Sequence, residues 1–189
     1  MSMPAAAREW RPDEVRALQD DKGNSPRYEL VDGELIVTPA PGVTHQRIVR
    51  DLLLLLVPFV RQAHVGEVFS SPADVALDGA SVLQPDVFVV PQLLKVERWS
   101  DVSDLLLAVE VLSPSTARHD RLTKRRFLQR HGVPEYWILD GDARLAERWT
   151  PDDTRPEILF DVLRWEPVHG DAVLSIDLPL LFGTDLVTP

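Results

Sequence analysis

Hydrophobic residues fall along this chain in short runs bounded by Gly, Pro and Asp, with one longer run in the first third. The longer run, LLLLLVPFV at residues 52–60, belongs to a stretch that is apolar on almost every side. A helix with that pattern is normally buried, so we expect a central helix over residues 45–62. Thr44 is its expected N-cap, and Pro58 is expected to bend the helix or end it early.

The short apolar runs predict β-strands. In YELVDGELIVT the step Asp32-Gly33 separates two such runs, which is a strong hairpin signal. The hairpin strands are expected at residues 27–31 and 34–38. The next expected strands cover residues 65–70, 74–77, 82–90, 105–112 and 136–139. A C-terminal extension of antiparallel strands, within residues 144–182, is expected at residues 144–150, 158–165 and 172–176.

Two further helices complete the pattern. Pro12, followed by two acids, fits the first turn of a helix that ends before Gly23. The turn SPSTARHD leads into a helix that runs to about His131, where Gly132 is the expected C-cap. From residue 45 to 140 the order is helix, three or four strands, helix and strand. This order predicts an α/β (α+β) fold with antiparallel pairs in the middle of a mixed sheet.

Length and composition indicate one domain over residues 1–189. That length suits a chain with its own core, and the lack of cysteine fits a reducing compartment. No signal peptide or membrane-spanning run is visible, so we expect a cytoplasmic protein with no membrane partner. The net charge of −10 argues against broad, non-specific adhesion to nucleic acid, but it leaves room for a local basic patch.

Two carboxylates stand inside apolar runs, Asp86 in VLQPDVFVV and Glu110 in LLLAVEVL. An unpaired buried carboxylate costs several kcal/mol, so each needs a cation, hydrogen bonds or a raised pKa. Consecutive strands are usually neighbours, so the two carboxylates are expected to meet. Mg²⁺ or Mn²⁺ bound between them would relieve their repulsion. The alternative is that each carboxylate pairs with an arginine or caps a turn.

Three kinds of basic residue could join this pair. Lys124 lies one helix after the Glu110 strand and could stabilise negative charge on a phosphate, but with Asp120 it also has the spacing of an ordinary helix ion pair. His45 could position water or phosphate, or could be a surface residue beside a helix start. Arg121 and Arg125 belong to a basic patch that could contact phosphates or pair with neighbouring acids.

Several segments follow one another along the chain: VDGEL, PAPGVTHQRIV, QPDVFVV, LLAVEVLSPST, the Asp120-x3-Lys124 spacing and GVPEYWILD. In this order they resemble the Uma2 family of restriction-endonuclease-like proteins, within the PD-(D/E)XK nuclease superfamily. The resemblance covers residues 27–140. The resemblance implies a restriction-endonuclease-like αβββαβ core, flanked by the N-terminal hairpin and the C-terminal strands.

The resemblance also implies roles for individual residues. Asp86 and Glu110, with a main-chain carbonyl near Val111, would bind Mg²⁺ or Mn²⁺, and Lys124 and His45 would be catalytic. Leu112 stands where the superfamily motif has its lysine, and Lys124 matches the position to which this family moves it. Many relatives carry a tyrosine where this chain has Leu128.

The implied activity is metal-dependent hydrolysis of phosphodiester bonds in DNA. The alternative is a nuclease-fold protein that binds nucleic acid or a protein partner without cutting, in which case it has no reason to hold a metal ion. The C-terminal strands, with Trp149 and Trp165, could form a homodimer interface, although aromatic residues at an edge are as often ordinary core.

Overall fold

The computed structural model describes residues 9–22, 25–91, 97–167 and 172–183. A six-stranded mixed sheet in the order β3-β4-β5-β6-β7-β8 forms its centre. These strands are β3 (Gly66–Ser70), β4 (Val87–Pro91), β5 (Leu107–Val111), β6 (Tyr136–Asp140), β7 (Leu145–Trp149) and β8 (Glu157–Leu159). Only β5 and β6 pair in parallel, and the other neighbours are antiparallel.

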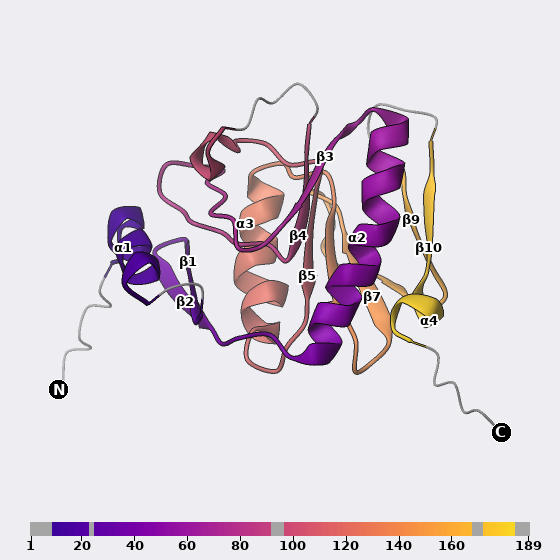
Figure 1. Ribbon diagram of the computed structural model, residues 1–189, viewed down its shortest axis with the longest axis horizontal. Helices are drawn as coiled ribbons and strands as arrows, with labels where there is room; N and C mark the ends of the chain where they lie inside the picture. The colour runs from indigo at the N-terminus through magenta and orange to yellow at the C-terminus, as the bar shows by residue number, and fades with distance from the viewer. Residues whose placement is uncertain (1–8, 23–24, 92–96, 168–171, 184–189) are drawn as a thin grey trace.

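Helices cover both faces of this sheet, with α2 (Val43–Ala63) on one side and α3 (Arg125–Arg130) on the other (Figure 1). The parallel β5–β6 pair needs a crossover, which α3 and the helical segment before it provide. The order α2, β3, β4, β5, α3, β6 is the αβββαβ core that the family resemblance implied, and it agrees with the order of elements expected from the sequence pattern. The predicted fold class is therefore confirmed.

Smaller elements flank this core on its two sides (Figure 1). On the side of α3 lie α1 (Pro12–Lys22) and the hairpin of β1 (Arg27–Val31) and β2 (Glu34–Thr38). On the side of α2 lie β9 (Val162–Trp165), β10 (Leu174–Asp177) and α4 (Leu178–Leu181). The hairpin and the β9–β10 pair are two-stranded sheets separate from the central one. Both hairpin strands have the predicted bounds.

Apolar residues explain why β4 and β5 are central. Both strands are buried on both faces: Val87, Val89, Leu107 and Val109 face the core under α2, and Phe88, Val90 and Ala108 face the core under α3. A strand covered on both faces has a continuous apolar run. Glu110 interrupts that run in β5, and Asp86 stands directly before β4.

The structure contradicts the predicted N-cap of the long helix and the early end that Pro58 could have caused. The N-cap is Gly42, in an extended conformation, and no side chain caps the helix, so Thr44 lies one residue inside the first turn. Pro58 lies inside the helix, which continues to Ala63. The helix covers only one face of the sheet, so its outer side faces solvent, and Leu54 is 67% exposed.

Three strand predictions also need correction. Residues 74–77 form no strand, and Val75 makes only an isolated bridge to Leu83. The predicted strand at 82–90 is divided, because Pro85 has no N–H for the ladder and β4 starts only at Val87. The predicted strand at 158–165 is divided between β8 and β9, which lie in different sheets.

The described helices include none that is long and apolar enough to cross a bilayer.

Candidate active site

The register of β4 and β5 brings the two predicted carboxylates together. Val87 pairs with Val109 in this antiparallel ladder. One residue before Val87 is Asp86 and one residue after Val109 is Glu110, so the same register places these two residues opposite each other. The main-chain N–H of Val111 donates a hydrogen bond to Asp86 Oδ2 over 2.9 Å. Both carboxylates are almost fully buried, at 2% and 3% exposure.

Asp86 is held by two basic side chains as well as by this N–H. Arg27 Nη1, on β1, lies 2.9 Å from Asp86 Oδ1, and His45 Nε2, on α2, lies 2.9 Å from Oδ2. Burial alone would raise the pKa of Asp86. His45, Arg27 and the Val111 N–H outweigh burial and hold that pKa far below its ordinary value, so Asp86 is ionised.

Lys124 lies among three carboxylates. Its Nζ is 2.8 Å from Glu110 Oε1, 2.9 Å from Glu29 Oε2 and 3.3 Å from Asp120 Oδ1. Its side chain is 1% exposed. Burial would lower the pKa of Lys124, but the three carboxylates outweigh it and raise that pKa well above the ordinary value. The ammonium is therefore a fixed positive charge beside Glu110.

The site contains more negative than positive charge. The pKa of Glu110 is raised well above its ordinary value, first by burial and then by repulsion from Asp86, Asp120 and Glu29, which Lys124 only partly offsets. Four carboxylates, those of Glu29, Asp86, Glu110 and Asp120, lie within ion-pair distance of only two permanent cations among the described residues, Arg27 and Lys124. The carboxylates therefore outnumber the permanent cations, and a bound cation would reduce their mutual repulsion.

A π-helical segment, η2 (His119–Lys124), positions Lys124. The wider π turn runs directly into α3, and both Asp120 and Lys124 are buried in it. The hydroxyl of Tyr136, on β6, donates a 3.1 Å hydrogen bond to the Asp120 carbonyl. Arg125 Nε donates to the Arg121 carbonyl over 2.9 Å. Single π turns inside helices are frequent at functional sites.

Two cavities open onto these residues. A small one of about 50 Å³ is lined by His45, Asp86, Glu110, Val111 and Lys124, together with the loop at residues 38–42 and Ser113, Ser115 and Thr116. A larger one of about 500 Å³ extends from Arg27, His45 and Asp86 along α2 to residues 70–72. Asp86 and His45 line both cavities, so a ligand in the larger cavity would lie beside the carboxylate pair.

The structure thus brings Asp86, Glu110, Val111, Lys124 and His45 into one place. The alternative to a metal site was that each carboxylate pairs with an arginine. Asp86 does pair with Arg27, whereas Glu110 pairs with Lys124. The predicted phosphate ligands lie elsewhere. Arg121 pairs with Glu147 and Asp140 at 2.6 and 3.1 Å. Arg125 contacts Gln129 and lies over the ring of Trp149.

Arg27 and Glu29 are site residues that the sequence reasoning missed. Both lie on β1, two residues apart, so they project from the same side of the strand. Glu29 stands among apolar residues in YELV, which is the signal that singled out Asp86 and Glu110. That signal could have found Glu29. Arg27 is the first residue of its strand and gave no comparable signal.

Comparison with known proteins identifies the family and a solved structure with a similar fold. The family model of Uma2, described as "Putative restriction endonuclease", matches residues 12–180. The chain belongs to the Uma2 family. A crystal structure of a protein from Anabaena variabilis ATCC 29413, described as a putative nuclease belonging to DUF820, superposes with a TM-score of 0.70 at 19% identity, covering 83% of this chain and 90% of that one.

The structural likeness supports the nuclease fold, and the family match confirms the predicted Uma2 membership. No curated protein matches the chain.

Proposed function

We propose that this Uma2 protein is a metal-dependent endonuclease that hydrolyses phosphodiester bonds in DNA. The observation that carries the proposal is the wall of the small cavity, where Asp86, Glu110, Lys124 and His45 meet with an excess of negative charge. A divalent cation would offset that excess. Opposed carboxylates beside a fixed ammonium match the needs of phosphoryl transfer, in which charge develops on the phosphate oxygens.

The residues present fit Mg²⁺ or Mn²⁺. Among the described residues no three His, Asp or Glu side chains group as a metal site. Mg²⁺ needs fewer protein ligands than that, because one or two carboxylates hold it and waters and substrate phosphate oxygens complete its coordination shell. Asp86 and Glu110 supply the carboxylates, and the main chain at Val111 lies beside them. When bound, the ion would polarise the phosphate and favour attack by water.

The chain's own residues would share the remaining work. Lys124 would orient the attacking water and stabilise the negative charge of the transition state. His45, hydrogen-bonded to Asp86, would position water or phosphate at the mouth of the larger cavity. Arg27 would hold Asp86 in place and keep it ionised.

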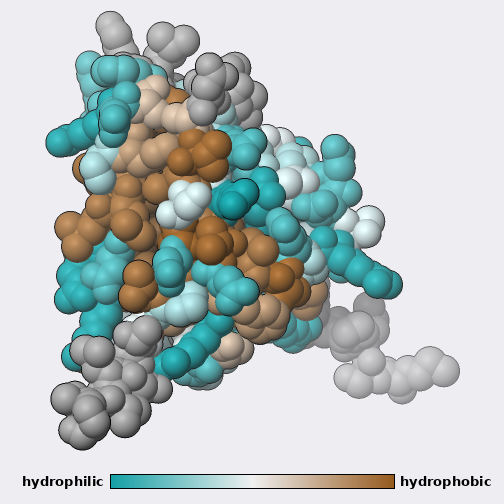
Figure 2. Space-filling view, turned by 90° about the vertical axis from the view of Figure 1, so that its right-hand side faces the viewer, coloured by the Kyte–Doolittle hydropathy of each residue, from teal (hydrophilic) through white to brown (hydrophobic). Residues whose placement is uncertain are grey.

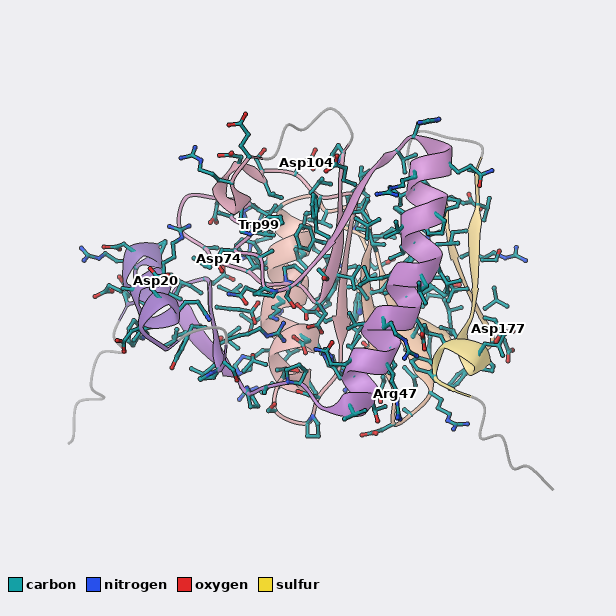
Figure 3. The ribbon with its side chains drawn as sticks, viewed as in Figure 1. Asp20, Arg47, Asp74, Trp99, Asp104 and Asp177 are labelled. Atoms are coloured by element: carbon teal, nitrogen blue, oxygen red, sulfur yellow. The ribbon has the colours of Figure 1, made fainter. Side chains whose placement is uncertain are left out.

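The larger cavity is the route by which nucleic acid would reach the site. Arg50 lines it, and Arg47 lies exposed at the same end of α2, as Figure 3 shows. Arg50 is paired with Asp51 at 2.7 Å, and Arg121 is paired with two acids, so exposed Arg47 suits a phosphate contact better than either.

Cleavage of plasmid and oligonucleotide substrates in Mg²⁺ or Mn²⁺ tests the proposal. The wild-type protein is expected to cut DNA, and Glu110→Ala is expected to lose at least about 100-fold of that activity. The matched control is Glu34→Ala, an exposed glutamate on β2. Equal cleavage by wild type and Glu110→Ala would show that another site, or a contaminant, does the cutting.

A non-cleaving, nucleic-acid- or partner-binding protein is the second candidate, and the Asp86–Arg27 ion pair favours it. Such a protein has no need for a metal ion at Asp86 and Glu110. Calorimetry with Mn²⁺ separates the two, because the nuclease binds the ion and Asp86→Asn weakens that binding. Absence of Mn²⁺ binding together with absence of cleavage favours the second function.

We also propose a homodimer, which would present two sites to the two strands of a duplex. Trp149 and Trp165 are buried in the core and cannot form its interface. Apolar residues instead gather over the face that carries α2, β10 and α4 (Figure 2). On α4 and directly before β10, Leu180 and Val173 are 66% and 47% exposed. Sedimentation of wild type and Leu180→Glu tests this, and a monomeric wild type contradicts it.

A further inference from the structure

Glu29 is a buried carboxylate that the proposed chemistry does not use. It lies on β1 and is 0% exposed. One of its oxygens, Oε2, lies 2.9 Å from Lys124 Nζ. The other, Oε1, accepts a 2.8 Å hydrogen bond from the main-chain N–H of Gln84, two residues before Asp86. A single side chain therefore links Lys124 to the segment that carries Asp86.

Lys124 needs such a partner if a cation binds. Its ammonium is 2.8 Å from Glu110 Oε1, and a divalent cation at Glu110 would repel it and compete for the same carboxylate. Asp120 is the more distant partner, at 3.3 Å, and lies on the same helical segment as Lys124. Glu29 is nearly as close as Glu110 and comes from a different element.

We propose that Glu29 is a positioning residue, which keeps the Lys124 ammonium in the site when the charge of Glu110 is taken up by a divalent cation. The inference rests on the proposed function for the role of that cation. It goes further by giving the N-terminal hairpin a part in the site. Strand β1 forms an ion pair with Asp86 through Arg27 and another with Lys124 through Glu29. It therefore contacts two groups whose relative position matters for the proposed reaction.

The Lys124 ammonium itself can be observed. The chain has only three lysines, Lys22, Lys95 and Lys124, so lysine labelled with ¹⁵N at Nζ gives a simple NMR spectrum. A buried, ion-paired ammonium exchanges its protons slowly with water, and K124R identifies the signal by removing it. Glu110→Gln removes the charge of Glu110 without any metal, so it imitates the state in which that charge is taken up.

In E110Q the Lys124 signal is expected to persist, because Glu29 and Asp120 still hold the ammonium. In the double variant E110Q/E29Q its proton exchange is expected to rise at least about tenfold, because the ion pair between Glu29 and the ammonium is lost. The control E110Q/E34Q changes an exposed glutamate of the same hairpin and is expected to behave like E110Q.

Equal exchange in E110Q and E110Q/E29Q would overturn the inference, and so would loss of the signal in E110Q alone. If E110Q/E29Q does not fold, E110Q/E29D replaces it. That variant keeps the charge but is shorter by one methylene, and unchanged exchange in it also contradicts the inference. Calorimetry with Mg²⁺ on the wild type is a separate arm, since a failure to bind Mg²⁺ contradicts the proposed function alone.

Discussion

At the scale of single residues, the site combines two carboxylates of opposite behaviour. Asp86 is buried but surrounded by donors and cations, which lower its pKa. Glu110 is equally buried, but it shares its one cation with two other carboxylates, and its pKa is raised. Carboxyl groups whose surroundings move their pKa values apart are typical of active sites.

Glu110→Gln is expected to stabilise the metal-free protein. Because the pKa of Glu110 is raised in the folded state, its contribution favours folding below its ordinary pKa and is lost as the pH rises through the folded value. Glutamine does not ionise, so the variant does not lose stability as the pH rises. Its free energy of unfolding should exceed that of wild type by about 1–2 kcal/mol at pH 8 and equal it near pH 4. Urea unfolding across that pH range measures the difference, and a destabilised variant at pH 8 would contradict it.

Lys124→Met is expected to destabilise the protein by about 3 kcal/mol, because it leaves Glu29, Glu110 and Asp120 buried without their shared cation. Arg126→Met, an exposed neighbour, serves as the control and should change the free energy of unfolding by less than about 0.5 kcal/mol. Thermal or urea unfolding at pH 7 measures both. Equal stability of the two variants would show that Lys124 is dispensable to the cluster.

At the scale of elements, the site depends on a helix that departs from α geometry. The π turn η2 carries Asp120 and Lys124 and is followed directly by α3. Its carbonyls at Asp120 and Arg121 accept side-chain hydrogen bonds from Tyr136 and Arg125. These bonds come from β6 and from the helix itself, so the π turn is fixed at the sheet end where Glu110 lies.

Tyr136→Phe is expected to loosen this turn. The lost hydrogen bond to the Asp120 carbonyl should cost about 1 kcal/mol of stability. If Lys124 acts in the transition state, kcat for cleavage should fall more than KM rises. Tyr28→Phe on β1 is the matched control, since these are the two tyrosines of the chain. Unchanged kcat in Tyr136→Phe would indicate that the turn does not need this bond.

At the scale of the whole molecule, the site joins three parts of the chain. The central sheet supplies Glu110 and, directly before β4, Asp86; the helical layers supply His45 and Lys124, and the hairpin supplies Arg27 and Glu29. A ligand bound among them connects all three parts and should stabilise the folded protein as a unit. The excess negative charge in the site makes a divalent cation the expected stabilising ligand.

Mn²⁺ is expected to raise the midpoint of thermal unfolding. At a concentration of about 100 times Kd, a ligand that binds only the folded state adds about 2.7 kcal/mol, which is roughly 5–10 °C for a chain of this size. The variants Asp86→Asn and Glu110→Gln should lose most of this shift, whereas Glu34→Gln should keep it. A shift of equal size in all variants would locate the ion outside the site.

The sequence by itself determined the fold class, the hairpin and the two carboxylates, because these depend on local patterns of apolar residues and turns. Only the tertiary structure showed that Arg27 and Glu29 reach the site, since their contacts with Asp86 and Lys124 join residues distant in the chain. It also showed that Arg121 is paired with acids on β6 and β7, and that Pro58 does not end α2. Local pattern identifies which residues need partners, and packing decides which partners they find.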